Sequence, residues 1–289
     1  MTCKMVMRVL VTGTGYVGRF LIPALEKDGY HVVAVSRSSK PLAMDLCNPD
    51  DCERVLQEVK PDVIVHTAAL SVPAKCEADE VAAMCSNAPQ HFARIAQELN
   101  PAVRFVFLST DQVLDGKGHL VPESIEAHPI NVYGKSKLKM EAAIKDIFAK
   151  HTIFRMSFVY GPEVEGAHNT FLQFALDKLR QGKEFDCFVD QKIRSCIYID
   201  DVVAALRLAV QGNIDGVVNL GGPEPLSRVE FCQRVARHVG VEDIVKGTTY
   251  SLPTPSPADI SMDISRLSKL LGRSPSTLSD ALVLMDAKL

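Results

Sequence analysis

The stretch Thr12-Gly13-Thr14-Gly15-Tyr16-Val17-Gly18 follows a short apolar run at residues 7–11. A helical apolar pattern over residues 20–25 comes next, and a second apolar run occupies residues 31–35. This order of strand, glycine turn, helix and strand predicts the first βαβ unit of a dinucleotide-binding sheet. Glycines at such a turn let the backbone approach a pyrophosphate at the helix N-terminus. The candidate cofactor residues here are Gly13, Gly15, Tyr16, Val17 and Gly18.

Helical and strand-like segments continue to alternate after this unit. Helices are expected over residues 48–59 and 78–99, the second with a bend or a fresh start at Pro89. Strands are expected at residues 63–66, 103–108 and 153–156. Alternation of this kind predicts an α/β fold, a Rossmann-type doubly wound parallel sheet with helices on both faces. The carboxyl ends of the strands are the edge at which ligands bind in such sheets.

The later part of the chain loses this regular alternation. Short strands are expected near residues 187–189 and 196–199, and helices at 170–179, 200–210 and 227–239. We expect residues 1–160 to form an NADP-binding Rossmann domain that also takes segments from about 185–220. Residues 161–289 should form a smaller C-terminal substrate-binding lobe that is interleaved with the sheet.

Composition narrows the class of protein. The chain has 289 residues, of which 47% are hydrophobic and 23% charged, as in an ordinary globular enzyme. A formal charge of −3 gives no argument for nucleic acid or an acidic membrane surface, and no run of 18 apolar residues occurs. Eight scattered cysteines without a C-x-x-C pair predict reduced thiols, with no disulfide framework and no metal site. The expected location is cytoplasmic.

The end of the second expected strand bears on the choice of cofactor. An NAD-selective site usually carries an acidic residue there for the ribose 2′-hydroxyl. This chain has Ser36, Arg37 and Ser38, whose hydroxyls and guanidinium suit a 2′-phosphate. The pattern favours NADP(H), with NAD(H) as the alternative and a solvated basic loop as the competing explanation. Ala68 and Ala69, at the end of the third expected strand, are small enough for a cofactor to pass over them.

Tyr133 and Lys137 are the candidate catalytic pair. They are four residues apart in an expected helix, so they share one face. A lysine ammonium beside a phenol favours the phenolate, which predicts that Tyr133 can donate a proton to a carbonyl oxygen near neutral pH. The same spacing also arises by chance from an exposed tyrosine and a solvated lysine. His66, at a strand end, fits a structural histidine better than a catalytic one.

Several motifs together resemble the extended short-chain dehydrogenase/reductase family. They are the glycine turn, Thr67-Ala68-Ala69, Tyr133-x-x-x-Lys137, and Arg155 followed by Val159-Tyr160-Gly161-Pro162. The segments 109–116 and 129–138 are similar to the S-T-D-Y-V-F-D-G and P-L-N-x-Y-G-K-x-K segments of the dTDP-4-dehydrorhamnose reductase subfamily. That subfamily includes the regulatory β subunit of methionine adenosyltransferase.

The resemblance implies roles for individual residues. Thr110 would hydrogen-bond the substrate carbonyl, Tyr133 would protonate it, and Lys137 would bind the nicotinamide ribose. Asp45 and Leu46 would flank the adenine, and Asn87 would support the lysine. Arg194 would contact a nucleotide-sugar phosphate, although a salt bridge at the rim explains it equally well. Gln112 and Asn169 complete the residues expected near the substrate.

Departures from the subfamily lie mostly in the sugar-binding half. Gln112 and Leu114 replace an aromatic pair, and the segment after Asp190-Gln191 lacks the usual glycine and proline. The first interpretation is an NADP(H)-dependent reductase of a nucleotide-linked 4-keto-6-deoxysugar. The alternatives are an NADP-binding regulatory subunit with a partner enzyme, and a nucleotide-sugar epimerase or other carbonyl reductase. A homodimer is a further open alternative.

Overall fold

The computed structural model forms two compact units. It describes residues 6–165, 170–182, 185–188, 192–241, 245–248 and 254–287. Unit 1 comprises Met1–Thr110, Asn131–Phe154 and Leu206–Val217. Unit 2 comprises Asp111–Ile130, Arg155–Ala205 and Val218–Leu289. Each unit is therefore assembled from segments that are far apart in the sequence.

A six-stranded sheet has the order β10-β5-β4-β3-β1-β2. Strand β1 pairs in parallel with β2 and β3, and β3 pairs in parallel with β4. The order reverses between β1 and β3, which is the switch point of a doubly wound sheet. The predicted Rossmann-type fold is confirmed. The strands are β1 (Arg8–Thr12), β2 (His31–Val35), β3 (Val63–His66), β4 (Arg104–Thr110), β5 (His151–Met156) and β10 (Gly216–Leu220).

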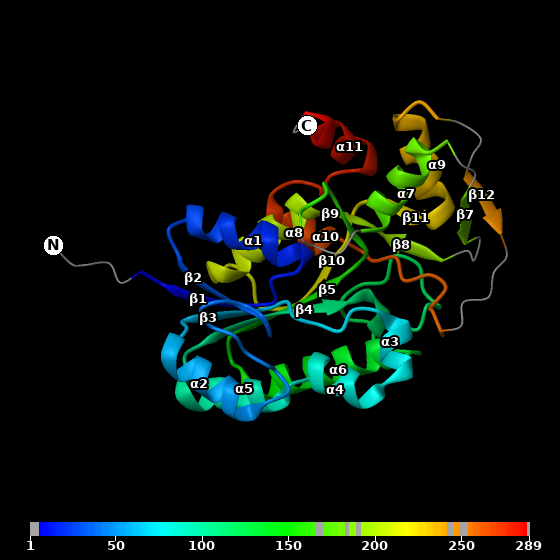
Figure 1. Cartoon of the computed structure of the whole chain (residues 1–289). Helices are drawn as coiled ribbons and strands as arrows, with labels where there is room; N and C mark the ends of the chain where they lie inside the picture. The colour runs from blue at the N-terminus through cyan, green and yellow to red at the C-terminus, as the bar shows by residue number, and fades with distance from the viewer. Residues whose placement is uncertain are drawn as a thin grey trace. The chain divides into compact units, whose positions relative to one another are not determined.

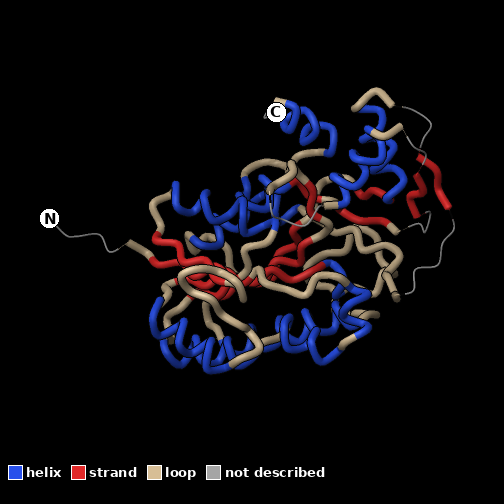
Figure 2. Tube along the Cα trace, in the orientation of Figure 1, coloured by secondary structure: helices blue, strands red, loops and turns tan. Residues whose placement is uncertain are grey.

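Helices cover both faces of the sheet in unit 1 (Figures 1 and 2). Helix α1 (Tyr16–Lys27) lies on one face, and α2 (Pro49–Val59), α4 (Glu80–Asn87), α5 (Gln90–Leu99) and α6 (Val132–Ile147) lie on the other. The strands are rich in β-branched residues, and β3 is buried along its whole length, as a strand covered on both faces must be. A core cluster joins β4 to α5 and α6 through Phe92, Phe105, Phe107, Ile144 and Phe148.

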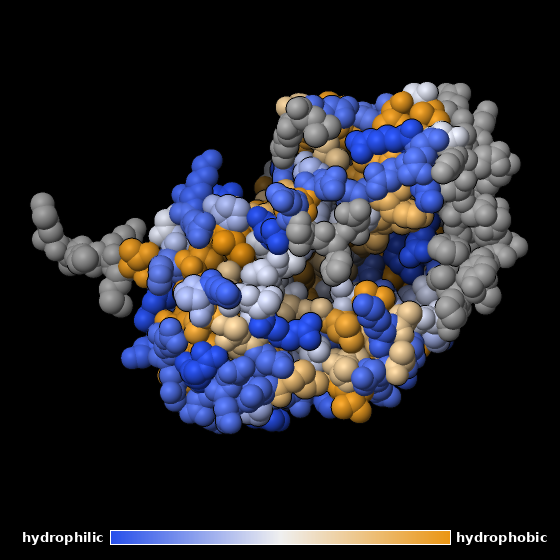
Figure 3. Space-filling view, in the orientation of Figure 1, coloured by the Kyte–Doolittle hydropathy of each residue, from blue (hydrophilic) through white to orange (hydrophobic). Residues whose placement is uncertain are grey.

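Helix α2 shows how sequence pattern decides orientation. Cys52, Val55, Leu56 and Val59 are buried, whereas Glu53, Arg54, Gln57 and Glu58 are exposed. This three-to-four-residue spacing places one apolar stripe against the sheet. The surface over α2 is accordingly hydrophilic in Figure 3. Asn48 starts the helix by accepting a hydrogen bond from the Asp50 amide at 3.0 Å.

The long helical region predicted over residues 78–99 is divided. Helix α4 ends at Asn87 and α5 begins at Gln90, with Pro89 at the N-cap of α5. A short helix, α3 (Pro73–Ala78), precedes both. Proline is tolerated at a helix start because the amide it lacks would have no intrahelical partner there. The predicted fresh start at Pro89 is confirmed.

Unit 2 contains the irregular elements. Ser227 caps α9 and exchanges hydrogen bonds with Glu230. Helix α8 begins at Ile199, so Asp200 and Asp201 lie in its first turn and do not precede it. The elements are η1 (Asp111–Val113), β6 (Val159–Tyr160), α7 (Phe171–Arg180), β7 (Phe185–Phe188), β8 (Ile193–Ser195), β9 (Ile197–Tyr198), β11 (Pro225–Ser227), α9 (Arg228–His238), β12 (Val245–Thr248), α10 (Ser265–Leu271) and α11 (Leu278–Asp286); α8 (Ile199–Val210) ends in unit 1.

The cysteines differ from expectation at one pair. Cys47 and Cys85 form a disulfide, with Cα atoms 5.4 Å apart, so the prediction of reduced thiols throughout is wrong for these two residues. They are separated by 38 positions and belong to no motif, and only the fold brings them together. Among the described cysteines, Cys52, Cys76, Cys196 and Cys232 form no disulfide.

The described part of the chain lacks two kinds of feature. None of its helices is long and apolar enough to cross a membrane. No group of three or more histidine, cysteine or acidic side chains is arranged there to hold a metal ion.

Candidate cofactor-binding and active site

The glycine turn connects β1 to α1 in unit 1, at the carboxyl end of the strand. Gly13 has a φ of +99°, and a Cβ at this position would lie 2.7 Å from the Ala68 amide nitrogen. A Cβ on Gly18 would lie 2.3 Å from the Gly13 carbonyl oxygen, so only glycine permits this close approach of helix to turn. Gly15, the N-cap of α1, faces open space with no atom within 4 Å of an added Cβ. The turn therefore fits a pyrophosphate at the start of a 12-residue helix.

The segment after β2 offers hydroxyls and a cation to solvent. Arg37 and Ser38 are exposed, and Ser36 is half-buried. The Ser36 hydroxyl pairs with Ser39 Oγ at 2.7 Å, while its carbonyl accepts a hydrogen bond from the Met44 amide at 3.0 Å. These bonds fold the segment into a compact loop at the same edge as the glycine turn. Its charge and exposure suit a phosphate.

Residues 45–47 lead from this loop into α2. Asp45 Oδ1 accepts a hydrogen bond from the Cys47 amide at 2.9 Å, and Leu46 packs against the unit 1 core. Arg54 donates to the Ala43 carbonyl at 2.9 Å and fastens the loop to α2. Asp45 and Leu46, the predicted adenine neighbours, are thus held by contacts that the sequence did not reveal.

Helix α6 carries Tyr133 and Lys137 one turn apart, as predicted. Its N-cap is Asn131, whose Oδ1 accepts a hydrogen bond from the Gly134 amide at 2.8 Å. Glu77 Oε1 accepts another from the Val132 amide at 2.8 Å, which places an anion at the positive end of the helix. Tyr133 is 8% exposed and Lys137 is 1% exposed, which excludes the interpretation of a solvated tyrosine and lysine.

Asn87 connects α6 to the end of β3. Its Oδ1 accepts a hydrogen bond from the Leu70 amide at 2.7 Å, and its Nδ2 donates to Ser136 Oγ at 3.0 Å. Ser136 in turn donates to the Tyr133 carbonyl at 2.7 Å. Asn87 therefore supports the helix between Tyr133 and Lys137 through a serine. Ser136 was not among the predicted site residues, although its position between the two catalytic candidates was a usable signal.

Lys137 and His66 face a desolvated interior. Burial lowers the pKa of Lys137 to about 7, and the nearby Glu141 carboxylate opposes this effect. Burial also lowers the pKa of His66 to about 3, with a further contribution from the Lys137 charge. His66 is therefore neutral, and its Nδ1 pairs with Thr12 Oγ1 at 2.6 Å. This is the structural histidine that the sequence favoured.

Thr110 ends β4, the strand against which α6 packs. It is 5% exposed and follows Ser109, whose hydroxyl donates to Glu141 of α6 at 2.6 Å. Unit 1 thus contains all three predicted catalytic residues, Thr110, Tyr133 and Lys137, together with the predicted cofactor residues.

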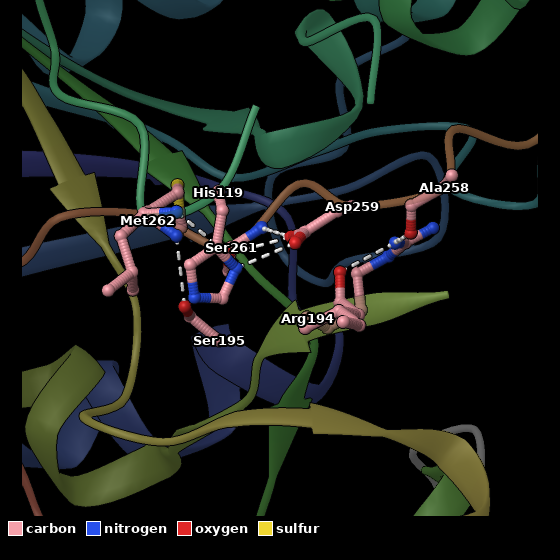
Figure 4. A network of polar contacts seen from close by, with 9 residues as sticks. His119, Arg194, Ser195, Ala258, Asp259, Ser261 and Met262 are labelled. Carbon is pink, nitrogen blue, oxygen red and sulfur yellow. Dashed lines mark hydrogen bonds and ion pairs between the residues drawn. The ribbon is translucent and has the colours of Figure 1, made fainter. Parts of the chain in front are cut away.

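Of the residues predicted to contact substrate, Thr110 belongs to unit 1, whereas Gln112 and Arg194 belong to unit 2. Gln112 is half-buried in η1, and Asn169 lies outside the described residues. Arg194 of β8 turns toward the backbone of residues 257 and 258 (Figure 4). Its Nη2 donates to the Pro257 carbonyl at 3.0 Å and its Nη1 to the Ala258 carbonyl at 3.2 Å. These bonds give Arg194 a structural task within unit 2, and its predicted phosphate contact stays a prediction.

His119, Asp259 and Ser261 form a polar cluster beside Arg194 (Figure 4). Asp259 Oδ2 lies 2.7 Å from His119 Nδ1, and Ser261 Oγ donates to Asp259 Oδ1 at 2.7 Å. Burial alone would raise the pKa of Asp259, but hydrogen bonds from Ser261 and His119 outweigh it and lower the pKa. Ser261 Oγ also lies 3.2 Å from His119 Nδ1, the same ring nitrogen that pairs with Asp259. A nucleophilic triad uses both ring nitrogens, so this cluster is not one.

The parallel sheet, the glycine turn at its switch point and the Tyr133–Lys137 helix define an extended short-chain dehydrogenase/reductase, a class of NAD(P)-dependent oxidoreductases. Within this class, the chain belongs to the family described as RmlD substrate binding domain, which matches residues 7–289.

Individual relatives agree with this assignment. A dTDP-4-dehydrorhamnose reductase of Salmonella typhimurium is 35% identical over 176 residues, which cover 60% of this chain and 58% of the relative. The methionine adenosyltransferase 2 subunit beta of Danio rerio is 29% identical over 239 residues, covering 79% of this chain and 73% of the relative. A solved dTDP-4-dehydrorhamnose reductase from Bacillus anthracis, in complex with NADP, superposes with a TM-score of 0.88 at 23% identity, covering 99% of this chain and 100% of that structure.

Proposed function

We propose that the protein is an NADP(H)-dependent reductase of a nucleotide-linked 4-keto-6-deoxysugar, of the dTDP-4-dehydrorhamnose reductase type. The observation that carries this proposal is the burial of Tyr133 and Lys137 one turn apart on α6, in the unit that holds the glycine turn. Named reductases among the relatives support the substrate class.

The residues of this chain have separate tasks in the proposed reaction. NADPH, when bound, supplies the hydride. The glycine turn and α1 hold its pyrophosphate, and Ser36, Arg37 and Ser38 receive the 2′-phosphate. Thr110 hydrogen-bonds the substrate carbonyl, and Tyr133 gives that oxygen a proton. The ammonium of Lys137 lowers the cost of forming the phenolate and holds the nicotinamide ribose.

The test compares wild type with Tyr133→Phe, measuring NADPH oxidation with a dTDP-4-keto-6-deoxyhexose. Loss of a general acid costs about 10²–10⁴-fold in turnover, whereas NADPH affinity should remain within about twofold because the ring is kept. Tyr30→Phe is the matched control, since Tyr30 is a half-buried tyrosine of unit 1 outside the site. Equal turnover of Tyr133→Phe and wild type would refute the proposed role of Tyr133.

The similarity to a methionine adenosyltransferase β subunit favours a second candidate function. In this alternative NADP is a structural ligand, and the protein regulates a partner enzyme. Tight NADPH binding without turnover of any nucleotide-linked keto-sugar, together with co-purification of an adenosyltransferase, would select the regulatory function over the reductase.

A further inference from the structure

Phe107 lies directly beneath the candidate catalytic lysine. It belongs to β4, three residues before Thr110, and its side chain is fully buried. Lys137 Nζ lies 4.2 Å from the centroid of the Phe107 ring. The face of an aromatic ring carries partial negative charge and attracts an ammonium at this distance, more strongly where water is excluded. Because Lys137 is almost completely buried, the ring replaces part of the solvation that an exposed lysine takes from water.

The other groups around Lys137 do not supply this solvation in full. His66 of β3 is neutral and adds no charge. Tyr133 precedes Lys137 by one helical turn, and Glu141 follows it by one turn. The Glu141 carboxylate is shared, since it accepts a hydrogen bond from Ser109 at 2.6 Å and lies 3.9 Å from Lys145 Nζ. Its attraction leaves the pKa of Lys137 lowered to about 7, so any further stabilisation of the ammonium matters near neutral pH.

We propose that Phe107 is a positioning residue for the reaction, whose ring face holds the Lys137 ammonium in place and favours its charged form. This inference rests on the proposed function, because that function gives the ammonium its tasks toward Tyr133 and the nicotinamide ribose. The competing explanation is that Phe107 only fills space, since it belongs to the same core cluster as Phe105. The two explanations differ in whether the charge distribution of the ring matters.

Fluorinated phenylalanines separate charge from shape. Replacing Phe107 by its 4-fluoro, 3,5-difluoro and 3,4,5-trifluoro analogues changes the volume little and weakens the negative face stepwise. The full-length protein is labelled with ¹³Cε-lysine, and the pH titration of the Lys137 signal, assigned by its loss in Lys137→Met, is followed by NMR. We expect the midpoint to fall with each added fluorine, by about 0.5–1 pH unit in total.

Phe105 provides the matched control. It is a fully buried phenylalanine of the same strand and is stacked on Phe148, with ring centroids 4.6 Å apart. The same analogues at Phe105 should leave the Lys137 midpoint unchanged. A midpoint that stays fixed in the Phe107 series, or that moves equally in both series, would overturn the proposal in favour of simple packing.

A kinetic measurement then separates this inference from the proposed function. With a keto-sugar substrate, the loss of turnover at high pH should move to lower pH in parallel with the NMR midpoint in the Phe107 series. A falling midpoint in a protein without reductase turnover would leave the ring–ammonium contact established and refute the reductase. A falling midpoint with an unmoved kinetic limb would refute the positioning role.

Discussion

At the scale of one residue, His66 makes the stability of the folded protein sensitive to acid. Its folded-state pKa is about 3, below the ordinary 6.5, because the ring is fully buried. Between pH 6.5 and about 3, His66 is protonated in the unfolded chain but stays neutral in the folded chain. Its contribution to the unfolding free energy is therefore present above pH 6.5 and falls as the pH drops toward 3. From pH 6.5 to pH 5 this loss amounts to about 2 kcal/mol.

Urea unfolding at several pH values checks this expectation. Over the same interval, His66→Gln should lose about 2 kcal/mol less unfolding free energy than wild type, whatever its absolute stability. His31→Gln is the control substitution, since His31 is an exposed histidine of the same unit. Identical slopes for His66→Gln and wild type would show that His66 titrates normally in the folded protein.

Single residues also show what sequence can and cannot predict about a site. Tyr133 and Lys137 were predicted together because a helix places positions four apart on one face. The role of Phe107 could not be read in this way. Phe107 reaches Lys137 only because β4 and α6 pack against each other, and that contact joins residues 30 positions apart.

At the scale of the element, α6 depends on its N-cap residue. Asn131 is almost fully buried, and its Oδ1 accepts the hydrogen bond from the Gly134 amide. Asn131→Ala leaves that amide without its partner and should lower the unfolding free energy by about 1–2 kcal/mol. Because the first turn carries Tyr133, turnover should fall as well.

Asn131→Ser is the companion variant, since serine is also a good N-cap and restores an acceptor. It should recover more than half of the stability that alanine loses, measured by urea unfolding. Equal losses for the alanine and serine variants would show that the cap bond contributes little to α6.

Element boundaries followed from capping signals where these were unambiguous. Ser227 with Glu230 and Thr277 with Asp280 form the capping boxes of α9 and α11, so both helix starts were predictable. The start of α8 was misplaced by one residue, because two aspartates suit the first turn as well as the cap.

At the scale of the whole molecule, the sheet takes its last strand, β10, from a part of the chain far from its other strands. Residues 206–217 return to unit 1 after a long excursion of the chain. They are held by Thr152, which donates to the Ile214 carbonyl at 2.6 Å, and by Arg104, which donates to the same carbonyl at 3.1 Å. Arg207 forms an ion pair with Asp28 at 2.6 Å. None of these contacts joins residues that are close in sequence, so no local sequence pattern predicts them.

Thr152→Val tests this attachment. Thr152 is fully buried, and valine keeps its shape while removing the hydroxyl. Arg104 still donates a hydrogen bond to the Ile214 carbonyl. The expected loss is therefore moderate, about 1 kcal/mol of unfolding free energy. Thr152→Ser retains the donor and should keep the hydrogen bond at the cost of one methyl group. A valine variant as stable as wild type would exclude a contribution from this bond.

The division of unit 1 into three separate segments also has a consequence during biosynthesis. A ribosome must add residue 217 before the last segment of this unit exists, by which time the unit 2 segments up to Ala205 have already been synthesised. Until then β5 lacks its neighbour β10 and presents unpaired backbone groups along one edge. Nascent chains arrested before Leu220 should therefore recruit chaperones, whereas chains released after Leu220 should resist a protease in the described part of unit 1.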